Sequence, residues 1–156
     1  MPHHWFFVDK TFAEAQKNAW GERIVPGRKI QGGAMSLESC FAVMGGDLES
    51  VRGRLRADDR IRRIVGMFPH DETFANLERA WETQSMPEAF RAAHTLKGVS
   101  RDLGFTPLFE VSNALADVLR PANEGGEVDA AAVEQLLDDV RRAYQLTLDA
   151  IEIIDE

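Results

Sequence analysis

The chain is poor in cysteine, because Cys40 is the only one among its 156 residues. A lone thiol cannot form an internal disulfide and has no partner at the spacing of a zinc site, so we expect a reducing compartment and no structural zinc. Long apolar runs are missing too, since stretches such as Trp5–Val8 end far short of a membrane span or a secretory signal. These absences favour a cytoplasmic protein that makes no contact with a membrane.

Positive charge is also scarce. The chain has 18 Lys and Arg residues against 26 Asp and Glu residues, which gives a formal net charge of −8. Such a surface is poorly suited to the backbone of a nucleic acid, so we expect no nucleic-acid partner. The visible basic cluster consists of arginines between positions 52 and 63, and we interpret it as a solvated helix face rather than a ligand site.

The apolar pattern divides the chain near residue 35. Residues 1–34 combine aromatic side chains with a connector that contains Gly and Pro, and we interpret them as an N-terminal extension and linker, with Met35 as an alternative internal start. From Ser36 onward the apolar spacing is helical, and no segment alternates apolar and polar residues convincingly. We therefore predict an all-α domain at residues 35–156, an antiparallel four-helix bundle with extra short N-terminal helices.

Caps and breaks set the first predicted helix boundaries. A helix is expected at about 36–44, and Asp47 is the expected cap of the next one. Pro69 then interrupts a longer apolar stripe that Asp71 can cap again, so the two halves form either one kinked helix or two abutting helices.

The remaining boundaries follow from similar signals. Ser85 and Glu88 have the form of a capping box for a helix that should run to about residue 102. The later signals are Gly104 as a stop, and Thr106 and Pro107 as the cap and first residue of the following helix. Pro121 and the loop from Asn123 to Gly126 should end that helix, and Asp129 should start the last one.

The predicted helix that follows Ser85 has two faces. At about 100° per residue, its apolar residues form an arc that should face the core: Ala89, Ala92, Ala93, Leu96, Val99 and Leu103. His94, Lys97, Gly98 and Arg101 are spaced i, i+3, i+4 and i+7, and they share the other side of the helix as the His94 strip. Two cations beside an exposed histidine would attract an anion.

Lys97 and Gly98 are unusual at their positions. Lys97 is the only lysine after Lys29, and a compact ammonium can meet a phosphoryl oxygen as a point charge. Gly98 costs a helix interior about 1 kcal/mol relative to alanine, and it removes a side chain that would keep a partner away from the imidazole. The alternative is that Lys97 and Arg101 form a solvated face and that Gly98 serves packing, and the spacing alone favours neither interpretation.

The segment Ala93–Gly98, followed at the right distance by Leu103 and Gly104, resembles the signature of the histidine-phosphotransfer (HPt) domain. The likeness extends over much of residues 41–153. It implies a helical bundle in which His94 receives a phosphoryl group from a response-regulator aspartate and passes it to another receiver. By the same resemblance, Lys97 would steady the phosphoryl oxygens and Gly98 would let the receiver approach.

The resemblance also implies the partners, which are response-regulator receiver domains and a hybrid sensor histidine kinase. We expect a phosphocarrier rather than an enzyme, because the sequence has no glycine-rich phosphate loop and no α/β region like an ATP domain. No cofactor is expected on the chain itself, and the receiver would hold the Mg²⁺ used in transfer. Arg101, Asn113 and Arg120 are surface candidates for docking that no motif fixes.

Other interpretations were weighed against this one. A non-phosphorylated helical interaction module would dock receiver or kinase domains, and phosphorylation of His94 distinguishes it from a phosphocarrier. A di-iron bundle needs Glu-x-x-His pairs, and position 91 is an arginine. His70 is interpreted as a residue of a helix junction rather than a second acceptor or a metal ligand. The aromatic residues of 1–34 are expected to cover a bundle face away from His94 or to join a second copy in a homodimer.

Overall fold

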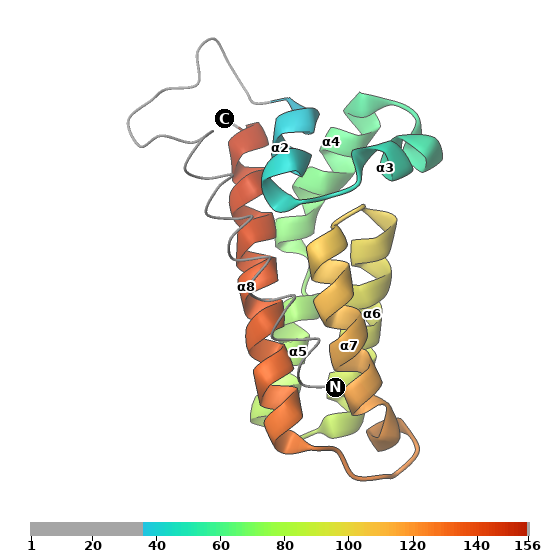
Figure 1. Cartoon of the computed structure of the whole chain (residues 1–156), viewed down its shortest axis with the longest axis vertical. Coiled ribbons are helices and arrows are strands. Elements are labelled where there is room, and N and C mark those ends of the chain that lie inside the picture. The colour runs from blue at the N-terminus through green and yellow to red at the C-terminus, as the bar shows by residue number, and fades with distance from the viewer. Residues whose placement is uncertain (1–35, 156) are drawn as a thin grey trace.

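The computed structural model describes residues 36–155, without the side chains at 153 and 155, and this range contains helices and no strand. Four helices form an antiparallel bundle (Figure 1): α5 (Thr73–Glu82), α6 (Met86–Asp102), α7 (Thr106–Asn123) and α8 (Ala130–Asp155). The predicted all-α bundle is therefore confirmed. The expectations for residues 1–34 and for a start at Met35 lie outside the described residues.

Three short helices lie toward the end of the bundle where α8 finishes (Figure 1): α2 (Leu37–Met44), α3 (Leu48–Leu55) and α4 (Asp58–Met67). The 3₁₀ helix η1 (Phe68–His70) joins α4 to α5, so the stripe broken by Pro69 forms two abutting helices. The predicted Asp47 cap is confirmed, since its side chain accepts a hydrogen bond from the Ser50 amide (3.1 Å). The predicted Asp71 cap is wrong by one position: Glu72 is the N-cap of α5 and makes no side-chain cap bond, while Asp71 accepts a hydrogen bond from the Thr73 amide (2.7 Å). We call α2, α3 and α4 the head of the domain.

Phe105, in the turn between α6 and α7, joins the head to the bundle. Its side chain is fully buried, and its ring lies edge-on to Phe68 of η1, with 5.0 Å between centroids, and 6.1 Å from Phe41 of α2. Aromatic pairs at these distances add to the stability that burial gives. One buried cluster therefore runs from α2 through η1 to the α6–α7 turn.

The α6–α7 turn requires glycine at position 104. Gly104 has a φ of +71°, and a Cβ atom there would lie 2.6 Å from the Asp47 carbonyl oxygen and 2.5 Å from a methyl carbon of Val51. The Gly104 carbonyl in turn accepts a hydrogen bond from the Asp47 amide (2.8 Å). Both the conformation and the close approach exclude a side chain, which confirms the predicted helix stop.

One arginine of α3 connects the helices of the head, and another connects the head to α6. The Arg52 guanidinium donates hydrogen bonds to Glu38 of α2 (2.7 Å) and to both carboxylate oxygens of Asp58 in α4 (2.9 and 3.0 Å). These bonds hold the pKa values of Glu38 and Asp58 below their ordinary values and raise the pKa of Arg52. Arg54 donates to the carbonyls of Arg101 (3.1 Å) and Asp102 (2.6 Å) at the end of α6. These members of the predicted solvated cluster therefore bind the protein itself.

The expected capping box at the start of α6 is wrong in its hydrogen bonding. The helix begins at Met86, as predicted, but the Ser85 side chain makes no capping hydrogen bond. The Ser85 amide donates instead to the Ala80 carbonyl (2.9 Å), which closes the end of α5. The helix boundary is thus held by the backbone of the α5–α6 turn.

Two boundaries of α7 also differ from the prediction. The helix begins at Thr106, with Pro107 as its second residue. Phe105 takes the cap position instead of Thr106, because its buried ring fixes the chain just before the helix. The helix continues through Pro121, since a proline so close to the end removes few helical hydrogen bonds, and it ends at Asn123, where the predicted loop begins. The Pro121 carbonyl then accepts hydrogen bonds from the amides of Glu124 (3.0 Å) and Gly126 (2.8 Å), which close the helix.

Candidate functional site

The two predicted faces of α6 are present in the structure. Ala93 and Leu96, on the apolar arc, are at most 1% exposed, whereas His94 is exposed. Lys97 and Gly98 are half-buried, and Arg101 is exposed on the last turn of the helix. Helix periodicity therefore brings the four residues of the His94 strip to the surface as expected. Val99 departs from the arc, because it is half-buried and lines a groove beside α4 and η1.

The His94 imidazole contacts the ring of Phe90, one turn earlier on α6. The two ring centroids are 5.8 Å apart, and the ring planes differ by 27°. Phe90 is itself only 8% exposed, so the imidazole lies against a buried support. The sequence prediction gave Phe90 no role, although its position four residues before His94 is a signal that the two side chains meet.

The cations around His94 differ in whether they have a partner. Each nearby arginine lies within ion-pair distance of a carboxylate: Arg91 of Glu88 (3.8 Å), Arg101 of Asp102 (3.5 Å) and Arg120 of Asp117 (2.7 Å). Lys97 forms no ion pair or hydrogen bond through its side chain with any residue that the structure describes. Unlike the three arginines, Lys97 can therefore bind an anion without first breaking an ion pair with the described part of the chain.

Gly98 leaves open space beside the imidazole. A Cβ atom at this position would meet no atom within 4 Å, apart from its own helix backbone and chain neighbours. Packing within the described part of the chain therefore does not require glycine here, in contrast to Gly104. This geometry weakens the packing interpretation of Gly98 and is consistent with close approach of another molecule.

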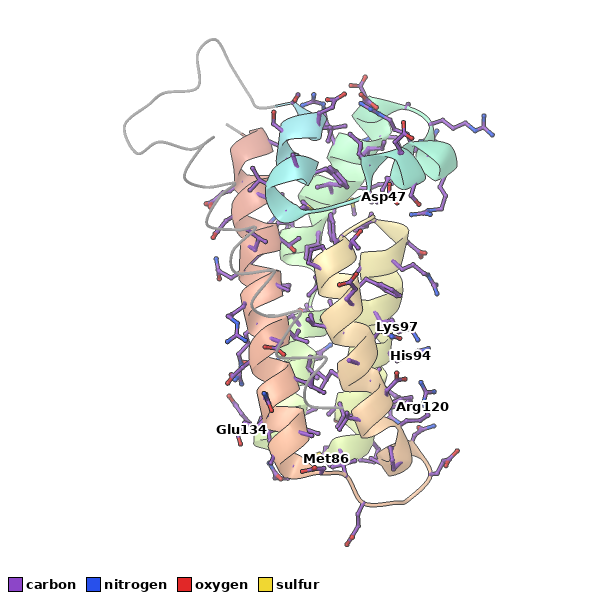
Figure 2. All side chains as sticks on the ribbon, viewed as in Figure 1. Asp47, Met86, His94, Lys97, Arg120 and Glu134 are labelled. Atoms are coloured by element: carbon purple, nitrogen blue, oxygen red, sulfur yellow. The ribbon has the colours of Figure 1, made fainter. Side chains whose placement is uncertain are left out.

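The three docking candidates lie on α6 and α7. Arg120, near the end of α7, lies over the ring that also contacts His94, because its guanidinium carbon is 5.8 Å from the Phe90 ring centroid. Figure 2 shows Lys97, His94 and Arg120 along one side of the bundle. Asn113 is half-buried on α7, roughly two helical turns before Arg120. Arg101 lies two turns after His94, where Arg54 binds its carbonyl group.

A groove between α5 and α6 adjoins the His94 strip. It has a volume of about 550 Å³, and its lining includes Arg79 from α5 and Arg91 and Thr95 from α6. The Arg79 guanidinium donates a hydrogen bond to the Asn76 side chain (2.9 Å). No pattern in the sequence predicted this groove, because its walls come from two helices whose pairing depends on the tertiary fold.

The structure gives His70 no ligand set. His70 is exposed at the end of η1, next to Asp71, as expected for a junction residue. Within residues 36–155, no three His, Cys, Asp or Glu side chains gather in a way that could hold a metal ion. In the same range, no helix is long and apolar enough to cross a membrane.

Fold and site together define a helical bundle that displays one histidine, a glycine and a lysine on the surface of a single helix, and the lysine has no ion pair within residues 36–155. The family model of the Hpt domain matches residues 70–146, and the chain is an Hpt-domain protein. Hpt domains are phosphocarriers rather than enzymes and take part in phosphotransfer in two-component signalling. The match covers fewer residues than the predicted likeness over 41–153, because it does not include α2, α3 and α4 of the head. Comparisons with curated proteins and with solved structures gave no match.

Proposed function

We propose that this protein is a phosphorelay intermediate in which His94 accepts a phosphoryl group from the aspartyl phosphate of one receiver domain and passes it to another. One observation carries the proposal: an exposed imidazole stands beside Lys97, a cation without a partner among the described residues, inside the Hpt match. The other histidine in residues 36–155, His70, has the acidic neighbours Asp71 and Glu72 instead.

The transfer step needs a nucleophile and an in-line leaving group. A ring nitrogen of neutral His94 uses its lone pair to form the N–P bond, while the P–O bond to the receiver's aspartate breaks. The aspartate leaves as a carboxylate with the bonding electrons, and the other ring nitrogen keeps its proton. The reverse reaction on a second receiver returns the phosphoryl group to an aspartate.

Lys97 and Gly98 assist this step in different ways. The Lys97 ammonium, one turn from the imidazole, stabilises the charge that develops on the phosphoryl oxygens without forming a bond to phosphorus. Gly98 lets the receiver bring its aspartate close to the imidazole, because the space beside it is empty. Arg120, together with Arg101 and Asn113, is assigned to the docking surface.

The receiver supplies what this chain does not offer. Glu88 and Asp102 of α6 and Asp117 of α7 each face an arginine, so these side chains are already paired and the surface of the His94 strip fits an anion better than Mg²⁺. We therefore place Mg²⁺ on the receiver, with no cofactor on this chain. The sequence has no phosphate loop, so a hybrid sensor histidine kinase would supply the phosphoryl group through its receiver domain.

Transfer of label from a radiolabelled phosphorylated receiver domain tests this function. We expect the wild-type chain to take up label that is labile to acid and stable to base, as phosphohistidine is. His94→Gln should fold normally and take up none, whereas His70→Gln, the matched exposed histidine, should be labelled like the wild type.

The controls separate the proposal from its alternative. Undiminished labelling of His94→Gln would place the acceptor elsewhere and contradict the proposal. A wild-type chain that binds the receiver domain but never becomes labelled would support the non-phosphorylated interaction module instead.

A further inference from the structure

The His94 imidazole packs against the ring of Phe90. Side chains on an α-helix lean toward its N-terminus and cover the preceding turn, so residue 94 lies over residue 90. The rings of the two residues meet at 5.8 Å and 27°. An exposed imidazole without such a contact would exchange freely among its rotamers. The ring of Phe90 therefore occupies the place of one neighbour against which the imidazole is oriented in this structure.

Phe90 is well placed to act as a support because it is itself held in position. Its side chain is only 8% exposed and belongs to the buried cluster of the bundle. From α7, the Arg120 guanidinium lies 5.8 Å from the Phe90 ring centroid, within the range of a cation–π contact. Asp117 binds the same guanidinium at 2.7 Å and limits its movement.

We propose that Phe90 is a positioning residue for phosphotransfer, which holds the His94 imidazole and the Arg120 guanidinium in fixed places relative to an incoming phosphoryl group. This inference rests on the proposed function of His94. Phe90 touches neither phosphorus nor the receiver, and it acts through the two side chains that its ring contacts. Fixing the direction of a nucleophile raises the fraction of encounters that are productive, so the effect falls on the maximal rate.

The first experiment compares Phe90→Leu, which keeps an apolar side chain but has no ring, with Phe90→Tyr, which keeps the ring. With saturating phosphorylated receiver domain, Phe90→Leu should lower the transfer rate about fivefold, while the concentration for half-maximal rate stays unchanged. Phe90→Tyr should transfer within about twofold of the wild type. The NMR signals of the His94 ring protons should shift in Phe90→Leu and stay close to their wild-type positions in Phe90→Tyr.

The second experiment tests whether Arg120 acts together with Phe90. Arg120→Gln is measured in the wild-type background and in the Phe90→Leu background, as a double-mutant cycle. If the ring holds both groups, Arg120→Gln should lower the rate less in the Phe90→Leu background than in the wild type. Strictly multiplicative effects on the rate would overturn the coupling through Phe90.

Several outcomes contradict the proposal directly. Phe90→Leu that transfers at the wild-type rate would show that orientation does not depend on the ring, and Phe90→Tyr that is as slow as Phe90→Leu would show the same. Should Phe90→Leu fail to fold by circular dichroism, Phe90→Met replaces it as the ringless variant. If the wild-type chain itself takes up no label, the proposed function fails; if only the Phe90 variants behave unexpectedly, this inference alone fails.

Discussion

The head and the His94 strip use basic side chains in opposite ways. In the head, the Arg52 guanidinium is engaged by Glu38 and Asp58, and Arg54 is engaged by two backbone carbonyls. On the His94 strip, Lys97 has no protein partner among the described residues. A cation whose donors are already used would have to give up hydrogen bonds before it could meet a phosphoryl group. The partners of a cation therefore say more about its role than the number of cations nearby.

Two glycines also differ between these regions. At Gly104, between the head and the bundle, a Cβ atom would collide with backbone and with Val51, whereas at Gly98 it would meet open space. One glycine is thus required by the fold, and the other is not.

Gly104→Ala should lower the free energy of unfolding by about 3 kcal/mol, because alanine is strained at positive φ and collides with the α2–α3 connection. Urea denaturation followed by circular dichroism measures this loss. Gly98→Ala is the matched control and should leave stability unchanged or raise it by up to about 1 kcal/mol. Equal effects of the two substitutions would remove the contrast between the glycines.

Lys97→Ala should slow phosphotransfer about tenfold, because the unpaired ammonium no longer stabilises the charge on the phosphoryl oxygens. Its free energy of unfolding should change by less than about 0.5 kcal/mol, as for most surface substitutions. Rapid-quench measurement of label transfer gives the rate. Arg101→Ala, which removes a cation already paired with Asp102, is the control and should have a smaller effect. If Arg101→Ala lowers the transfer rate more than Lys97→Ala does, Arg101 and not Lys97 is the cation that stabilises the phosphoryl oxygens.

Gly98→Leu should reduce transfer from a receiver domain several-fold while stability stays equal or rises, because leucine favours the helix but occupies the space beside His94. The transfer rate is measured at a series of receiver concentrations, which shows how strongly the leucine hinders the approach of the receiver. Gly98→Ala, which adds a smaller side chain, should lower the rate less. An unfolded Gly98→Leu would mean that this glycine serves packing after all.

Arg52→Gln should have the smallest effect, a modest loss of stability at neutral pH with no change in the rate of transfer. The hydrogen bonds of Arg52 lower the pKa values of Glu38 and Asp58 in the folded state, so their contribution is present above the ordinary values of 4.5 and 3.8. It is lost as the pH falls through the lowered values. Denaturation at a series of pH values should therefore show the wild type and the variant converging in acid. A difference that persists there would contradict this assignment.

Much of the candidate site could be predicted because it lies on one helix. The spacing of His94, Lys97 and Gly98 places them on one surface whenever residues 86–102 are helical. The predictions that were wrong, at Ser85 and around Phe105, concern helix ends. There, backbone hydrogen bonds and the burial of one ring replaced the side-chain caps that local sequence suggested. Local patterns set a helix face, but neighbouring elements set where the helix stops.

The helical class of the protein and the exposure of His94 follow from local sequence, since helix geometry depends on residues within a few positions of one another. Packing between helices determines which cation has no partner within residues 36–155 and which side chain supports the imidazole. Arg54 reaches the end of α6 from a position 47 residues earlier, and Arg120 reaches Phe90 from the neighbouring helix. Such contacts depend on how α3 and α7 pack against α6, and no periodicity within a single helix specifies them.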